Sequence, residues 1–174
     1  EVLKGLSADH LRIIPNDEEH SIAWLLWHLT RCEDITMNLL VADADQVLLA
    51  ENWLDKLSIT CKDTGNTMTA QEIADFSNQV DITALILYRT AIGRRTHAII
   101  QQETPATLHQ KVNAADVGRI LAEGAVLEDA RFMVDYWSKR DHAGLFLMPA
   151  TRHILTHLKE AQNIRKKVLR MQHD

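Results

Sequence analysis

Apolar residues recur every three or four positions along most of the chain, which is the spacing expected for one face of an α-helix. Segments that alternate apolar and polar residues, as a half-buried strand would, are few. The 174 residues include only three prolines and six glycines. The sequence therefore predicts an all-α protein, whose long amphipathic helices we expect to pack as a four-helix bundle with short additional helices.

The first predicted helix runs from about Glu18 to about Ala42 and carries its large apolar residues on one face. The members of this face are Ile22, Leu25, Leu26, Leu29, Ile35 and Leu39. His28 and Cys32 lie on or beside the same face. Their side chains are therefore expected to point toward the core.

A capping box, Thr69-Ala-Gln-Glu72, marks the start of the next helix, and Met68 and Ile73 are placed to form a hydrophobic staple around it. Apolar residues then recur as far as about Glu103, which predicts one long helix over residues 69–103. Its apolar face is expected to contain Ile73, Phe76, Val80, Ala84, Leu87, Tyr88, Ala91 and Ile99.

Two connecting segments show weaker periodicity. In the first, residues 43–66, an apolar cluster is expected to form a short helical turn or to pack down as a lid. This cluster consists of Trp53, Leu54 and Leu57. The second segment, residues 106–128, follows the helix break at Pro105, and Gly118 and Gly124 are expected to interrupt a short helix within it.

The C-terminal part of the chain predicts two further helices. One runs from about Leu127 to Lys139, and the last runs from Pro149 to about Met171, because proline suits the first position of a helix. Residues 141–148 are expected to form a loop between them. The inward face of the last helix is expected to contain Ala150, His153, Ile154, His157, Leu158, Ala161, Ile164 and Val168.

The sharpest chemical feature of the chain is the pair His153 and His157 on this last helix. A spacing of four residues places both imidazoles on one face, one turn apart, where they can contact the same ion. His28 from the first helix would complete a three-histidine set with an open coordination position, as expected of a catalytic metal site rather than a closed structural one. The alternative is that these are core histidines whose ring nitrogens are satisfied by neighbouring groups.

Other classes of metal site fit the residues less well. A zinc peptidase of the His-Glu-x-x-His type needs a glutamate where Ile154 stands. Di-iron carboxylate bundles need two Glu-x-x-His pairs, and the sequence contains none. Cys32, four residues after His28, could supply a fourth ligand, although a small buried thiol is the preferred interpretation.

Two acidic residues after His28 and six further histidines are the other polar candidates of the sequence. Glu33 and Asp34 are interpreted as solvated carboxylates, with an outer-shell contact to a ligand imidazole as the alternative. Six further histidines have no partner at ligand spacing, namely His10, His20, His97, His109, His142 and His173. Of these, only His142, in the predicted loop before the last helix, is placed to approach the site.

Composition limits the classes of function. With 46% hydrophobic residues, the chain can bury the core of one soluble domain over residues 1–174 without a disulfide or a structural metal. No run of 18 apolar residues predicts a membrane span. A net charge of -5 with no basic stripe argues against a nucleic-acid partner, and the basic residues at 165–170 suit the end of a helix dipole. Two cysteines and no apolar leader make the cytoplasm the default location.

Two motifs carry a resemblance to a known family. They are Trp24-Leu-Leu-Trp-His28-Leu-Thr-Arg31 and Met148-Pro-Ala-Thr-Arg-His153-Ile-Leu-Thr-His157-Leu-Lys-Glu-Ala161. Together they resemble the DinB-like superfamily of helical bundles. The resemblance implies that His28, His153 and His157 bind a divalent metal ion, with zinc or nickel favoured and iron or manganese as alternatives. It also implies a homodimer.

The middle of the chain is similar to one branch of that family, which contains mycothiol-dependent enzymes. The similar segments are residues 64–69 and 88–96. This resemblance implies a metal-dependent S-transferase that uses a small-molecule thiol, such as mycothiol or bacillithiol, and an electrophilic substrate. Two alternatives stay open: a metal-dependent hydrolase, and a metal-binding or stress-related bundle without catalysis. The cysteine at position 32 departs from the polar residue that relatives often carry there.

Overall fold

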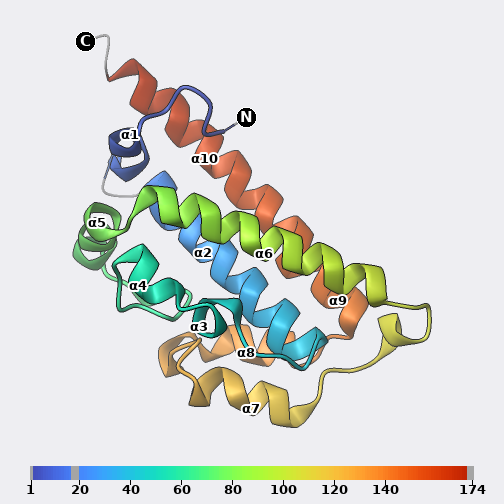
Figure 1. The fold of residues 1–174 in the computed structure, drawn as a ribbon. Helices are drawn as coiled ribbons and strands as arrows, with labels where there is room; N and C mark the ends of the chain where they lie inside the picture. The colour runs from blue at the N-terminus through green and yellow to red at the C-terminus, as the bar shows by residue number, and fades with distance from the viewer. Residues whose placement is uncertain (1, 17–19, 172–174) are drawn as a thin grey trace.

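The computed structural model describes residues 2–16 and 20–171, and these residues form an all-α bundle (Figure 1). The helices are α1 (Ala8–Arg12), α2 (Ile22–Asp34), α3 (Val47–Ala50), α4 (Trp53–Leu57), α5 (Ala70–Gln79), α6 (Ile82–Gln102), α7 (Ala114–Ala122), α8 (Arg131–Trp137), α9 (His142–Leu147) and α10 (His153–Arg170). Two π-helical segments, Ile35–Val41 and Met148–Arg152, continue α2 and precede α10. The prediction of an all-α bundle is confirmed.

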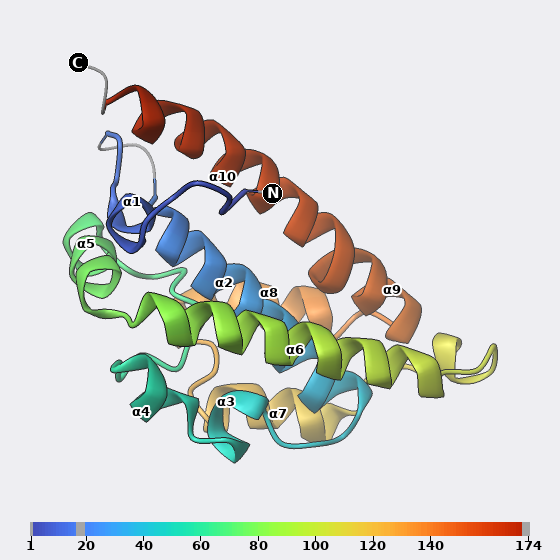
Figure 2. The same ribbon diagram turned by 45° about the horizontal axis from the view of Figure 1, so that its top comes forward.

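The long helix α2 holds the bundle together. It contacts both α6 and α10, and Figures 1 and 2 show it running alongside them. Ile22 and Leu25, near its start, belong to one buried apolar cluster, whereas Cys32 and Ile35, near its end, belong to a second. No helix among the described residues is long and apolar enough to cross a membrane.

The starts of several helices follow from their capping residues. The side chain of Ser21 accepts a hydrogen bond at the start of α2, while the predicted start near Glu18 lies outside the described residues. The predicted capping box of Thr69 and Glu72 is confirmed at the start of α5. The short helical turn predicted around Trp53 is confirmed as α4.

The prediction of one long helix over residues 69–103 is wrong, because the chain turns between α5 and α6. Val80 leaves the helical region there, with a ψ of 134°, although its buried side chain continues the apolar pattern. The carboxylate of Asp81 accepts a hydrogen bond from the backbone N–H three residues later, and the Asp81 N–H donates to the carbonyl of Leu57. The new helix leaves Leu87 56% exposed, so its predicted place on the apolar face is also wrong.

Residues 106–128 contain a regular helix, α7, in place of the interrupted one that was expected. Gly118 lies inside α7 and does not interrupt it. Gly124 follows the helix in the left-handed region, with a φ of +67°, which glycine adopts at little cost. The helix predicted over residues 127–139 is shorter than expected, because a 3₁₀ turn precedes α8.

Helix α9 (His142–Leu147) occupies most of residues 141–148, so the loop predicted there is wrong. The side chain of Asp141 accepts from the N–H of Gly144 and caps this helix. Pro149 lies in the first turn of the π-helical segment Met148–Arg152, as expected for proline, but this segment follows α9 directly, so no loop precedes it. The wider π-helical turn accommodates a residue that has no N–H to donate, and the Thr151 hydroxyl donates to the carbonyl five residues earlier.

The fully buried side chain of Arg31 ties α2 to the segment that follows it. Its guanidinium donates to the carbonyl of Lys62 (2.8 and 3.0 Å), the carboxylate of Asp34 (2.8 Å) and the hydroxyl of Tyr88 (3.0 Å). Asp34 also accepts from the Tyr88 hydroxyl and from the backbone N–H groups of residues 47 and 48. This buried network fixes the connection between α2 and α5 against the bundle.

The interpretation of Glu33 and Asp34 as solvated carboxylates is wrong. Glu33 is 2% exposed and pairs with Arg89, while Asp34 is fully buried against Arg31. The hydrogen bonds of both carboxylates go to arginine, tyrosine, asparagine and backbone groups rather than to imidazole. The alternative role as outer-shell partners of the metal site is therefore not supported by these contacts.

Replacing Arg31 with methionine should destabilise the protein by about 3–5 kcal/mol, because Asp34 would be left buried and without its cationic partner. Arg131→Met is the matched control, since Arg131 is exposed and pairs with Glu128 on the surface. Urea unfolding followed by circular dichroism measures the free energy of unfolding of both variants. Similar losses of stability in the two variants would contradict this account of the network.

Candidate metal centre

Three histidines from two helices meet inside the bundle. His28 lies in the middle of α2, and His153 and His157 lie one turn apart at the start of α10. The Nε2 atom of His153 is 3.1 Å from the Nε2 atoms of both His28 and His157. Among the described residues, these three form a group whose ligand atoms all lie within 4.8 Å of one another. The structure therefore brings together all three predicted site residues.

The Nδ1 atoms of His28 and His157 have hydrogen-bond partners, and these partners determine which ring nitrogen carries the proton. Nδ1 of His28 lies 2.8 Å from the carbonyl oxygen of Thr64, and Nδ1 of His157 lies 2.9 Å from the carboxylate of Glu160. Carbonyl and ionised carboxylate oxygens only accept hydrogen bonds, so each Nδ1 carries the proton. The Nε2 atoms of His28 and His157 are consequently lone-pair donors that point toward His153.

This set of donors fits a divalent cation. Zinc–nitrogen bonds of about 2.0–2.1 Å in tetrahedral geometry place two ligand nitrogens roughly 3.3 Å apart, close to the 3.1 Å seen here. The Nδ1 atom of His153 is buried and has no hydrogen-bond partner among the described residues. It can therefore carry that ring's proton and leave a third Nε2 lone pair facing the other two.

Burial keeps two of the imidazoles neutral, which is the form that binds metal. Loss of solvent lowers the pKa of His28 to about 4, and the hydrogen bond to Thr64 opposes this only in part. Burial also lowers the pKa of His153 to about 3, with further lowering from the neighbouring rings of His28 and His157. At neutral pH a cation would thus not compete with a proton for the Nε2 atoms of His28 and His153.

A tight turn presents the Thr64 carbonyl to His28. The side chain of Asp63 accepts from the N–H of Gly65 (2.7 Å), and Gly65 has a φ of +78°. A Cβ atom at this position would lie 3.0 Å from Nε1 of Trp24, so both the backbone angle and the space require glycine. Arg31 holds the carbonyl two residues before Thr64, which anchors the turn to α2.

Glu160 contacts the histidine group and His20 contacts Glu160, and neither residue was predicted from the sequence to belong to the site. One carboxylate oxygen of Glu160 contacts His157 at 2.9 Å, and the other contacts His20 at 3.2 Å. Trp24 stacks between His20 and His28, with ring centroids 4.1 and 4.9 Å away. The spacing of three residues between His157 and Glu160 was available in the sequence as a same-face pair.

Cys32 borders the histidines without joining their group. Its Sγ atom lies 4.0 Å from Nε2 of His28, and burial raises its pKa to about 12, so it is a neutral thiol at pH 7. The interpretation as a buried thiol is consistent with this position. His142 does not approach the site as expected, because it is buried against Glu103 at 3.1 Å. His173 lies outside the described residues.

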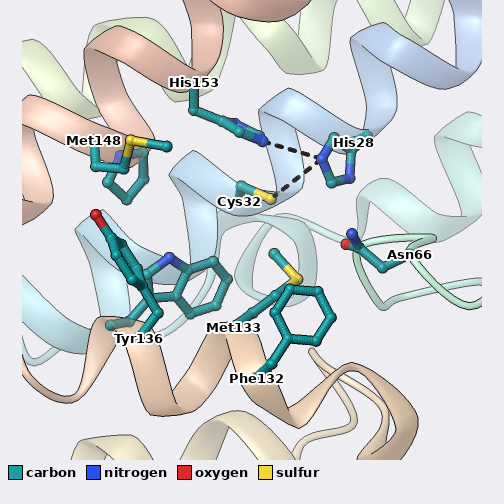
Figure 3. A pocket seen from close by; sticks show the side chains of 10 residues that line it. His28, Cys32, Asn66, Phe132, Met133, Tyr136, Met148 and His153 are labelled. Atoms are coloured by element: carbon teal, nitrogen blue, oxygen red, sulfur yellow. Dashed lines mark hydrogen bonds between the residues drawn. The ribbon is translucent and has the colours of Figure 1, made fainter.

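A pocket of about 380 Å³ opens beside the histidines. His28, Cys32 and His153 line one end of it, and side chains from α8 line the opposite end (Figure 3). His157 does not line this pocket. An ion held by the three Nε2 atoms would therefore have an open side toward a space that is large enough for a small molecule.

The comparisons with known proteins identify the family. A family model described as the DinB superfamily matches residues 1–134, which is more than half of the chain. The chain belongs to the DinB superfamily. The matched residues include His28, whereas the helix that carries His153 and His157 follows them. The family suggested by the sequence motifs is confirmed.

A solved structure shows the same fold as this DinB superfamily member. It is described as the crystal structure of the conserved protein of locus from Enterococcus faecalis, and its TM-score is 0.70 at 16% sequence identity. The likeness covers 97% of this chain and 86% of the other. At this identity the likeness establishes the fold alone. The comparison with curated proteins gives no match.

The pKa shifts predict that the metal-free protein loses stability as the pH falls from about 6.5 to about 4. Unfolded histidines bind a proton near pH 6.5, but His28 and His153 do so in the folded protein only near pH 4 and 3. The unfolded state therefore binds more protons in this range, and each such histidine can cost up to about 1.4 kcal/mol per pH unit.

Urea unfolding of chelator-treated protein at several pH values measures this slope. His153→Leu should make the dependence on pH shallower, whereas His97→Leu, at an exposed position of α6, should leave it unchanged. An equal slope in the wild type and in His153→Leu would contradict burial of a neutral imidazole.

Proposed function

We propose that this DinB superfamily protein is a divalent-metal-dependent S-transferase, which joins a low-molecular-weight thiol to an electrophilic carbon. The observation that carries the metal-dependent part is the convergence of three histidine Nε2 atoms beside a pocket that two of these histidines line. A structural site would be closed by a fourth protein ligand, whereas this one has an open side. The thiol in the proposal is supported by the resemblance of residues 64–69 and 88–96 to thiol-dependent relatives.

The residues of the chain prepare the site for this chemistry. Thr64 and Glu160 hold two imidazoles with their lone pairs inward, so no rearrangement of those rings is needed to receive an ion. A divalent ion bound to three neutral imidazoles keeps its full charge and lowers the pKa of a thiol or water that binds it. Zinc or nickel is the ion we favour for a set of three nitrogens.

The proposed reaction needs no reactant other than the thiol and the electrophile. The thiol sulfur forms a bond to the electrophilic carbon, and the bond from that carbon to its leaving group breaks. The leaving group takes the electron pair, and the thiol proton passes to solvent. Cys32 takes no part, because its buried thiol stays protonated at neutral pH. The product is a thioether.

Cobalt substitution tests the proposal, because thiol binding to Co²⁺ produces a sulfur-to-metal absorption band. We expect 2-mercaptoethanol to produce this band in the wild type and in the exposed-residue control His109→Ala, but not in His157→Ala. The wild type with its native ion should also consume thiol and release chloride from an aryl or benzyl chloride.

Two results would contradict the proposed function. Cobalt binding without any sulfur band on addition of thiol would exclude the thiol as a ligand of the ion. Hydrolysis of an ester with no consumption of thiol would assign the ion to activation of water instead. Circular dichroism of His157→Ala should match the wild type, because the apolar clusters of the bundle do not depend on an ion.

A further inference from the structure

The pocket beside the histidines is lined almost entirely by apolar, aromatic and sulfur-containing side chains. Phe132, Met133 and Tyr136 of α8 face the histidine end across the pocket (Figure 3). Met148, from the π-helical segment before α10, closes a further side. Aromatic rings and thioether sulfurs make favourable contacts with an aromatic ring, so this lining is suited to an aromatic guest.

Polar and charged groups are scarce in this lining. Two histidines line the pocket, but among the described residues no aspartate, glutamate, lysine or arginine does. The uncharged hydrogen-bonding side chains of the lining, besides the histidines and Cys32, are those of Asn66, Tyr136 and Trp137. Arg140 lies 4.1 Å over the ring of Tyr136 but does not line the pocket. A charged guest would lose its hydration there without gaining a partner of opposite charge.

The size of the pocket limits the guest further. A volume of about 380 Å³ is at the small end of the range for ligand sites, which is roughly 300–1,000 Å³. The space ends at His28 and His153, so one end of the guest lies directly beside the proposed metal position. A compact body with its reactive atom at one end fits this arrangement.

We propose that the pocket binds the electrophilic substrate, and that this substrate is a compact, uncharged molecule with an aromatic or bulky apolar body. The assignment rests on the proposed function, since it places the reactive carbon at the histidine end. A thiol with a large polar body is a poor occupant, because away from the histidine end its many polar groups would have only the side chains of Asn66, Tyr136 and Trp137 as hydrogen-bond partners. Such a body belongs outside the pocket.

Three probes with the same ring and different charges test this assignment directly. They are para-fluorobenzyl alcohol, which is neutral, para-fluorobenzylamine, which is a cation at pH 7, and para-fluorobenzoate, which is an anion. Fluorine NMR measures their binding to the full chain after chelator treatment, so that no ion can attract the anion. We expect the neutral probe to bind at least about tenfold more tightly than either charged probe.

A pair of matched variants locates the binding. Phe132, on α8, lines the pocket and is 64% exposed. Leu155, on α10, is 61% exposed and does not line the pocket. Both can be replaced by serine without disturbing the core. Phe132→Ser should weaken binding of the neutral probe by about threefold to tenfold, because one aromatic contact is lost, whereas Leu155→Ser should not change it.

The variant His157→Ala separates this inference from the proposed function. His157 belongs to the histidine group but does not line the pocket, so the variant should lose metal and still bind the neutral probe. Probe binding by a wild-type chain that takes up no metal would support the ligand class and contradict the proposed function. Equal or tighter binding of a charged probe, no binding of the neutral probe, or equal effects of the two serine variants would overturn the pocket assignment.

Discussion

The structure depends on a constraint that acts along α2: a polar group buried in this helix must find its partner inside the protein. The guanidinium of Arg31 satisfies this constraint by donating hydrogen bonds to the carbonyl of Lys62 and the carboxylate of Asp34. His28 meets it at one nitrogen by donating to the carbonyl of Thr64. The segment after α2 is therefore held in place by the polar side chains of α2, and the same contacts orient the first histidine of the site.

The other nitrogen of His28 connects this constraint to function. Its lone pair faces His153 at 3.1 Å, and the lone pair of His157 does the same from the other side. Three imidazole lone pairs this close together are a poor arrangement without a positive charge between them and a favourable one with a divalent ion. Because the apolar pocket begins at two of these rings, the arrangement couples a place for the ion to a place for a small, uncharged guest.

The site was more predictable from the sequence than the turns that surround it. The spacing of His153 and His157 on an apolar helix face was sufficient to bring them together, because helix geometry alone fixes their relation. Periodicity failed at Val80, whose buried side chain continues the pattern while Asp81 starts a new helix. The contact from Thr64 to His28 uses a backbone carbonyl, so no side-chain motif could reveal it.

The central claim is that the three histidines bind one metal ion. Elemental analysis of the full chain, purified without an affinity tag and compared with His153→Ala and the exposed control His109→Ala, tests it most directly. We expect about one equivalent of a transition metal in the wild type and in the control, and none in His153→Ala. Absence of metal from the wild type after reconstitution with zinc and with nickel, or full retention of metal by His153→Ala, would contradict it.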